Sequence, residues 1–328
     1  MFGDARNLPC GRSWSLTMKA VSRRTLLKGA LASCLPLSFP SVVLSRDRNE
    51  TGARPRVVQV QGPIEASLEV LLEELGGIGR FVKSGDTVLI KPNMSFPNPS
   101  EQATTTNPSL VRAMARHCLL AGAKRVLVAD HPMRAVKLCL EMTGMKEACG
   151  DLPSVHLIGA SQEGMFHQVT LSRTKELQAV KVLRAALDAD VQINLPRMKS
   201  HGATTVSLGM KGNMGLIWDR AIFHSRLDLN EAIGDLNTLI RADLTILDGS
   251  RALIAGGPLG PGPVEALGCL IGGADPVAVD AFGVQRVEWY GKRIAPDQIP
   301  HLVACHKRGI GEIDLDRVDI VSRKAPAS

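Results

Sequence analysis

The sequence is poor in aromatic residues and lacks the short motifs of common catalytic and nucleotide sites. Phe, Trp and Tyr make up 3% of the 328 residues. Few side chains can therefore stack on unpaired bases, and we expect no nucleic-acid partner. Neither the Gly-x-Gly-x-x-Gly nor the Walker pattern occurs, and His-Glu-x-x-His, the serine elbow and catalytic-cysteine patterns are also absent. These absences exclude several familiar enzyme classes without naming a reaction.

Cysteines are too scattered to indicate a metal centre. After the first 45 residues they stand at Cys118, Cys139, Cys149, Cys269 and Cys305, with no Cys-x-x-Cys pair. The sequence therefore contains no iron–sulfur or zinc motif, and the cofactor stays unknown. An oxidising compartment would allow a disulfide between Cys139 and Cys149. Burial as apolar thiols is the favoured interpretation.

No apolar run is long enough to cross a bilayer, and residues 1–45 are predicted to be a leader. Ser22-Arg23-Arg24-Thr25-Leu26-Leu27-Lys28 resembles a twin-arginine export signal. The apolar stretch from Gly29 to Leu44 spans roughly 16 residues, fewer than a spanning helix needs, and Pro36 and Pro40 interrupt it. We therefore expect the twin-arginine translocation machinery as a partner and a periplasmic or otherwise exported protein.

Two alternatives within the leader stay open. Met18 lies four residues before the motif, so translation could begin there. Leu31-Ala32-Ser33-Cys34 fits a lipid-attachment box, which would anchor the protein at Cys34. The leader also holds six basic residues against one acidic residue, whereas residues 46–328 hold 33 against 31. The net charge of +7 therefore says little about an acidic partner.

Strand and helix patterns alternate along residues 46–328, which predicts an α/β fold with a mainly parallel sheet flanked by helices. Short apolar runs predict strands at 56–60, 87–90, 125–129, 191–195, 244–247 and 267–272. Helices are expected at 64–75, 108–122, 229–240, 276–290 and 299–308. We expect a single domain, formed either as one body or as two lobes.

The stretch 191–224 is the richest in polar side chains that could form a site. Its first strand is stopped by Pro196, and Lys199, His201, Lys211, Asn213 and His224 follow it. Three glycines recur in its middle, where a regular helix or strand would avoid them: Gly209, Gly212 and Gly215. This combination indicates a functional site rather than simple packing.

Other polar residues follow the ends of predicted strands in the same way. They are Lys91 with Asn93, Asp130, Asp248 and Asp275. In open parallel sheets, ligands bind outside the carboxyl ends of the strands, so we expect these side chains to converge on one crevice. The helix that begins at Pro108 would point its N-terminus the same way, which favours an anion. The sequence thus predicts an anionic small molecule or cofactor as the ligand.

Several ordered motifs together resemble the domain-of-unknown-function family 362. They are Lys91-Pro92-Asn93, Lys199-x-His201, Lys211 to Gly215, Arg220-x-x-x-His224, Asp248-Gly249, Gly257-Pro258 and Asp275-Pro276 to Asp280. The resemblance covers roughly residues 56–290. It implies the architecture and marks candidate residues, but it implies no settled reaction. Many relatives carry a ferredoxin-like cysteine module, which this sequence lacks.

Two classes of function fit these residues. As a metal- or cofactor-dependent, redox-associated enzyme, the protein would use His201, His224 and Lys199 in catalysis. Its ligand-binding residues would be Lys91, Asn93, Lys211, Asn213, Asp248, Asp275 and Asp280. His201, His224 and Asp248 are the candidate metal ligands. In the alternative, the same groups form a non-catalytic periplasmic binding or cofactor-handling module.

Some of these residues also have a purely structural interpretation. Asp275 before Pro276 is a natural helix N-cap. Asp248-Gly249 could form a turn. The Gly- and Pro-rich segment 256–263 could be a rigid loop, a lid or a backbone anion site.

Overall fold

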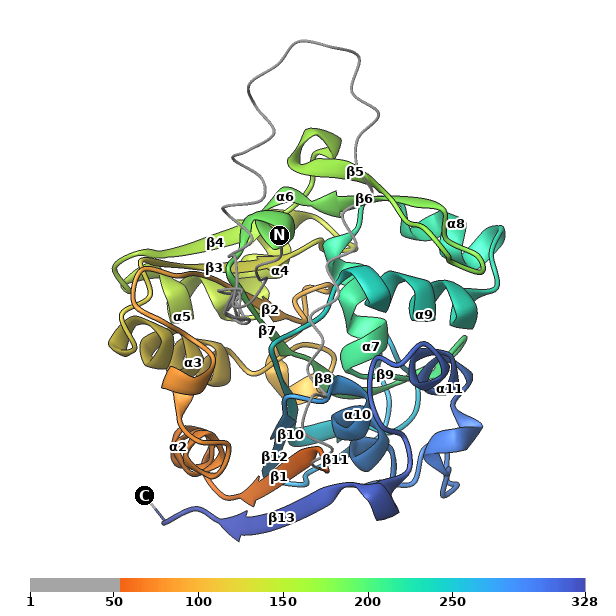
Figure 1. Ribbon diagram of the computed structural model, residues 1–328. Coiled ribbons are helices and arrows are strands. Elements are labelled where there is room, and N and C mark those ends of the chain that lie inside the picture. The colour runs from red at the N-terminus through yellow and green to blue at the C-terminus, as the bar shows by residue number, and fades with distance from the viewer. Residues whose placement is uncertain (1–53, 328) are drawn as a thin grey trace, which may run out of the picture. The chain divides into compact units, whose positions relative to one another are not determined.

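The computed structural model describes residues 54–327, all of which fall in one compact unit. Ser22–Lys28, Met18 and Cys34 lie outside the described residues, so the predicted leader keeps the status of a prediction. A mixed, mostly parallel sheet occupies the centre of this unit, with helices on both faces (Figure 1). The predicted α/β fold is confirmed.

The central sheet has eleven strands in the described residues. Eight follow the order β13 (Asp319–Lys324), β1 (Arg56–Gln61), β12 (Cys269–Gly273), β10 (Leu244–Leu253), β7 (Val191–Leu195), β2 (Thr87–Pro92), β3 (Arg125–Asp130) and β4 (Val155–Gly159). Along β10 lie β8 (Arg197–His201) and β11 (Val264–Glu265), and β8 also pairs with β9 (Thr205–Ser207). Only β12 among the eight runs antiparallel to its neighbours.

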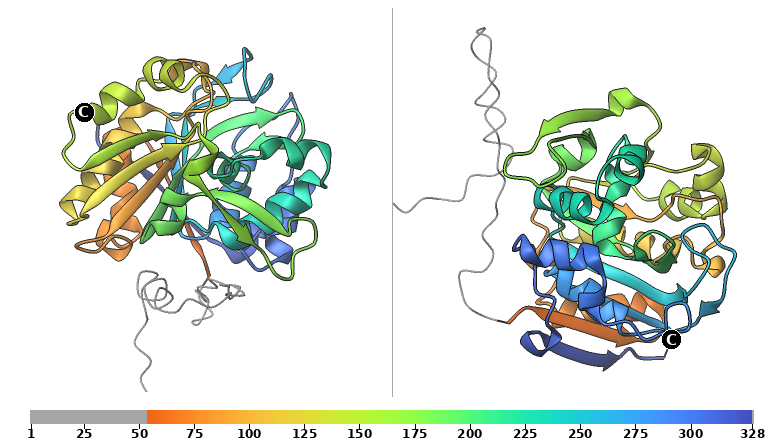
Figure 2. Two further views of the ribbon diagram at one scale, coloured as in Figure 1. Left: turned by 90° about the horizontal axis from the view of Figure 1, so that it is seen from above. Right: turned by 90° about the vertical axis from the view of Figure 1, so that its right-hand side faces the viewer.

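Successive side chains along the central strands pack alternately into two separate cores. In β2, Leu89 packs into one core, whereas Val88 and Ile90 pack into the other, as the two-residue period of a strand requires. The second core is covered by α2 (Ile64–Glu74), α3 (Pro108–Leu120) and α5 (Met145–Gly150). The first is covered by α9 (Leu229–Leu239), α10 (Pro276–Val284) and α11 (Pro300–Lys307). Figures 1 and 2 show these layers from three sides.

The remaining elements are short. The helices are α4 (Val136–Met142), α6 (Arg184–Asp188), α7 (Gly209–Gly212) and α8 (Arg220–Ser225), with the 3-10 turn η4 (Asn213–Leu216) after α7. A separate two-stranded sheet pairs β5 (Phe166–Thr170) with β6 (Ala179–Leu183). Between residues 54 and 327 no helix has the length and apolar character needed to cross a bilayer. The five described cysteines are free and buried, as the favoured interpretation predicted.

The structure corrects three expected boundaries. After Pro196 the chain resumes a strand, β8, so Lys199 and His201 lie within a strand rather than after one. The strand expected at 244–247 runs on to Leu253, so Asp248-Gly249 lies within a strand and does not form the alternative turn. The helix predicted for 276–290 ends at Val284. Strand pairing of β8 along β10 overrides the local turn preferences in the first two cases.

Strand order creates a topological switch point between β2 and β7. After β2 the chain passes through α3 to β3 on one side, whereas after β7 it leads to β10 on the other side. The two connections diverge, so the carboxyl ends of β2 and β7 leave a crevice between them. Ligands of open α/β sheets bind at such a position.

Candidate functional site

A cavity of about 200 Å³ opens at this switch point. Its lining comes from the end of β2 and the loop after it, from β8 and β9, from α7 with η4, and from α8. The lining residues are Lys91, Asn93, Ser95, Phe96, Met133, Lys199, His201, Ser207, Lys211, Gly212, Met214, Gly215, Arg220, Ala221, His224 and Pro258. Six of the ten predicted site residues line it: Lys91, Asn93, Lys199, His201, Lys211 and His224.

Four basic side chains reach this cavity, and no Asp or Glu lines it in the described residues. Lys91, Lys199 and Lys211 are 3%, 1% and 9% exposed. Burial is the largest influence on all four groups and lowers the pKa of each, because a charged group loses its hydration. Nearby cations add to the effect, and together with burial they lower the pKa of Lys211 to about 7. Arg220 is the fourth cation.

The lysines differ in what their amino groups contact. Lys199 Nζ donates to the carbonyl oxygen of Thr104 at 2.6 Å and to Asn93 Oδ1 at 3.3 Å. It also lies 5.1 Å from the centroid of the Phe96 ring, a favourable position for a cation. Lys211 Nζ, by contrast, has no hydrogen bond or ion pair with any described residue, yet it lines the cavity. Lys199 is held in place, whereas Lys211 is available.

Lys91 forms a buried ion pair with Asp130, at 3.5 Å between Nζ and Oδ1. The other carboxylate oxygen, Oδ2, accepts hydrogen bonds from the Met94 amide and the Ser95 hydroxyl. Oδ1 is buried with no hydrogen-bond partner. A Cβ on Gly215 would stand 2.0 Å from that oxygen and 2.8 Å from Lys91 Cε. Glycine is therefore required at 215 for the pair to form.

His201 and His224 face each other across 6.0 Å between ring centroids, with nearly parallel rings. His201 Nδ1 accepts a hydrogen bond from the Ala203 amide at 3.2 Å, which places the proton of the neutral ring on Nε2. Burial, reinforced by the charge of Lys211, lowers the pKa of His201 to about 3. His201 is therefore a neutral donor near pH 7. His224 is exposed, and its pKa is also lowered, mainly by partial burial.

The remaining predicted residues support the site from outside the cavity. Asp280, on α10, accepts the amide hydrogens of Gly209 and Met210, each at 2.8 Å. Burial raises the pKa of Asp280 to about 7, against the influence of those two bonds. Asn213 links the side chains of Asn194 and Asn237 in a buried amide chain. These contacts fix the start and the end of the glycine-bearing segment that carries Lys211.

Asp248 and Asp275 serve the fold instead of the cavity. Asp248 Oδ2 accepts from Arg197 and from the Asn107 amide at 2.6 Å, so the anion at the start of α3 is this carboxylate. Asp275 caps α10 through the Val277 and Ala278 amides. In residues 54–327 no group of three or more His, Cys, Asp or Glu side chains could hold a metal ion. The structure therefore does not bring the three candidate metal ligands His201, His224 and Asp248 together as one group in the described residues.

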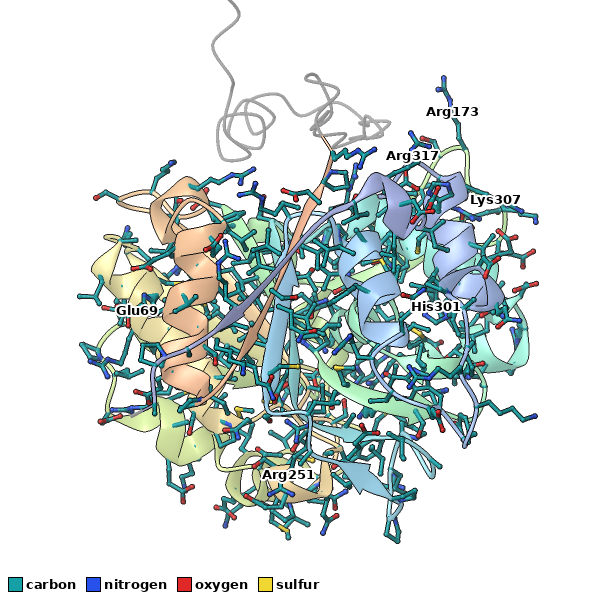
Figure 3. All side chains as sticks on the ribbon, turned by 90° about the horizontal axis from the view of Figure 1, so that it is seen from below. Glu69, Arg173, Arg251, His301, Lys307 and Arg317 are labelled. Carbon is teal, nitrogen blue, oxygen red and sulfur yellow. The ribbon has the colours of Figure 1, made fainter. Side chains whose placement is uncertain are left out.

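Arg220 and His301 lie near the cavity but were not among the predicted site residues. Arg220 stands in the Arg220-x-x-x-His224 motif, which could have identified it. His301, on α11 (Figure 3), gave no signal in the sequence. Both of its ring nitrogens are buried without a hydrogen-bond partner. Burial and the charge of Lys211 lower the pKa of His301 to about 3.

The Gly- and Pro-rich segment 256–263 forms part of the cavity wall. Pro258 lines the cavity, and the Gly257 amide donates to Ser200 Oγ on β8 at 2.9 Å. A Cβ on Gly257 would lie 1.9 Å from the Ser200 carbonyl oxygen. This close approach favours the rigid-loop interpretation of the segment.

Comparison with known proteins places this architecture in a family. The chain is 31% identical over 262 residues to the thylakoid-associated protein sll1697 of Synechocystis sp., an alignment that covers 76% of each protein. The lactate racemase apoprotein of Thermoanaerobacterium thermosaccharolyticum matches with a TM-score of 0.45 and 13% identity, over 72% of this chain and 58% of that one. Residues 88–285 match the family model described as Domain of unknown function (DUF362). The chain belongs to this family.

Proposed function

We propose that the cavity at the switch point binds a small organic anion, a carboxylate or a phosphate ester. One observation carries this proposal: four basic side chains reach a cavity whose lining contains no carboxylate. The nearby carboxylate of Asp130 is already engaged by Lys91, Met94 and Ser95. A negatively charged ligand would supply the missing counter-charge.

Electrostatics supports the same ligand. Without a ligand, burial and nearby cations lower the pKa of each lysine, against the opposing influence of Asp130 on Lys91 and Lys199. A bound anion reverses this effect, because an opposite charge nearby favours the protonated amine. The free energy gained from these contacts is larger in a buried cavity than at an exposed surface.

Shape supports an organic ligand of modest size. A volume of about 200 Å³ is below the ~300–1,000 Å³ of cavities that hold drug-sized molecules. Apolar side chains share the lining with the basic ones, namely Phe96, Met133, Met214, Ala221 and Pro258. The ligand would place its carbon skeleton against these and its charge against the lysines.

The proposal is tested by comparing three lysine variants in calorimetric titrations with a panel of carboxylates and phosphate esters. Lys211→Ala and Lys199→Ala should each weaken binding at least about tenfold, or ~1.4 kcal/mol. The control is Lys307→Ala, which removes an exposed lysine at the end of α11 (Figure 3) and should change nothing. Equal affinity for anions and for their neutral amides would overturn the proposal.

The two histidines suit an enzyme better than a passive binding module. His201 offers a neutral donor, and exposed His224 is the group that could take up or release a proton. If they act together on a bound ligand, His201→Ala, His224→Ala and the double variant should lose similar amounts of turnover. Additive losses in ligand affinity, without turnover of any panel member, would favour the non-catalytic binding or cofactor-handling module.

We also propose that the leader directs export through the twin-arginine machinery, on the strength of Ser22–Lys28. Replacing Arg23 and Arg24 with Lys should retain the precursor in the cytoplasm, as cell fractionation would show. N-terminal sequencing should find a mature chain that begins near Arg46. A chain that begins at a lipid-modified Cys34 would support the anchored alternative, and export of the double-lysine variant would contradict the proposal.

A further inference from the structure

We propose that Lys211 is a nucleophilic lysine that condenses with the carbonyl group of a small 2-oxo acid bound in the cavity. This inference rests on the proposed anion binding and names the ligand class more narrowly. It starts from the difference among the three lysines, since all are buried in one cavity and only one lacks a partner.

Lys91 and Lys199 have fixed partners that favour a protonated amine, although burial lowers the pKa of Lys91 and lowers that of Lys199 well below its usual value. Lys91 faces Asp130, and Lys199 donates to two oxygens beside an aromatic ring. Each amino group is thereby fixed in direction. They would hold the carboxylate of the ligand, with the guanidinium of Arg220 as a third cation at the same cavity.

Lys211 is suited to react. Its amino group lines the cavity without a hydrogen bond or ion pair among the described residues, although the side chain is only 9% exposed. A buried ammonium without a partner is costly, so the neutral amine is favoured. Lysines become nucleophilic when they are desolvated or lie beside other cations. Both conditions hold here, and the lowered pKa of about 7 agrees.

Besides burial, the neighbouring cations Arg220 and Lys91 lower the pKa of Lys211. The charged or titratable groups around it are Lys91 on β2, Asp130 on β3, Lys199 and His201 on β8, Arg220 and His224 on α8, Asp280 on α10 and His301 on α11. Cationic and neutral groups predominate in this set. Asp280 is occupied by two backbone amides, and Asp130 lies beside Lys91.

The condensation needs no redox partner. The lone pair of Lys211 Nζ attacks the carbonyl carbon, a C–N bond forms, the nitrogen loses one proton, and the carbonyl oxygen takes up one proton to become a hydroxyl. The hydroxyl then takes up a second proton, the C–O bond breaks and water leaves, while the nitrogen loses its second proton as the C=N bond forms. Protonation of the resulting imine would place a positive charge beside the carboxylate of the same ligand.

The test is reductive trapping on the intact protein. Incubation with 2-oxobutyrate and cyanoborohydride should add one reduced oxo acid per chain, and peptide mapping should locate it on Lys211. At sub-saturating oxo acid, where the rate reflects the free protein, it should be half-maximal near pH 7, whereas an ordinary lysine, with a pKa of about 10.4, reacts well only at higher pH. Lys211→Arg and Lys211→Met should abolish the adduct, with thermal unfolding measured to verify that each variant folds.

Calorimetry with 2-hydroxybutyrate, which lacks the carbonyl group, separates the two proposals. Binding of both acids without an adduct on Lys211 would overturn the nucleophilic role and leave anion binding intact. Absence of binding by either acid, together with trapping on exposed lysines alone, would overturn both. An adduct that persists in a folded Lys211→Arg variant would likewise contradict the inference.

Discussion

Two buried ion pairs lie in the central sheet, Arg197–Asp248 between β8 and β10 and Lys91–Asp130 between β2 and β3, and they are built differently. Asp248 Oδ2 accepts hydrogen bonds from Arg197 and from the Asn107 amide. Its Oδ1 accepts hydrogen bonds from the Ser250 amide and hydroxyl. Arg197 donates further to the Ser100 carbonyl oxygen. The Lys91–Asp130 pair spans 3.5 Å and leaves one carboxylate oxygen without a hydrogen bond.

This difference indicates a structural role for the Arg197–Asp248 pair and a ligand-binding role for the Lys91–Asp130 pair. The Arg197–Asp248 pair connects β8, β10 and the start of α3, and its acceptors are filled by the protein itself. The Lys91–Asp130 pair lies against the cavity, where Lys91 can still contact a ligand. We therefore expect the first pair to contribute mainly to stability and the second mainly to binding.

Breaking the Arg197–Asp248 pair should have the largest effect on the free energy of unfolding. Arg197→Met leaves the Asp248 carboxylate buried without its cation, and such losses cost about 3–5 kcal/mol. Urea denaturation should show the decrease in the free energy of unfolding. A decrease below about 1 kcal/mol would mean that the pair does not hold the strand and helix together.

Crowding the Lys91–Asp130 pair should lower the free energy of unfolding by an intermediate amount. A methyl group at position 215 would displace Asp130 and Lys91, and overpacking of this kind costs about 1–3 kcal/mol. Gly215→Ala should therefore lower both stability and anion affinity. Gly212→Ala is the matched control for stability, because its Cβ would meet nothing closer than 3.7 Å. Equal behaviour of the two variants would contradict the role of Gly215.

Removing Lys91, the cation of the Lys91–Asp130 pair, should lower the free energy of unfolding the least. Lys91→Met keeps an apolar stem of similar length, Asp130 retains its bonds to Met94 and Ser95, and the Arg220 guanidinium still supplies a positive charge near Asp130. We expect a loss of about 1–2 kcal/mol in unfolding free energy and a fall in anion affinity of at least about tenfold. A stability loss equal to that of Arg197→Met, with unchanged affinity, would reverse the assignment of the two pairs.

Much of the fold and part of the site could be predicted from the sequence. Alternation of apolar runs gave the strands and helices, and the rule for parallel sheets brought Lys91, Lys199 and Lys211 to one cavity. The continuation of the chain as β8 after Pro196 could not be predicted. It depends on pairing with β10, a segment some fifty residues further along the chain.

The roles of individual carboxylates were harder to predict, because a side chain near a strand end can face a helix as well as a crevice. Asp248 and Asp280 both satisfy backbone amides of other segments. Such partners are distant in sequence and leave no local pattern. His301 was missed for a similar reason, since only the packing of α11 brings it under the influence of Lys211.

The central claim, that the cavity binds a small anion through its buried lysines, is tested most directly by calorimetry with 2-hydroxybutyrate in buffers of different ionisation enthalpy. Lys211 has a pKa of about 7 without a ligand, and an anion raises it. Binding at about pH 8 should therefore take up close to one proton, and affinity should decrease as pH rises above about 7. Absence of binding, or binding that takes up no proton and is matched by the neutral amide of the same acid, would contradict the account.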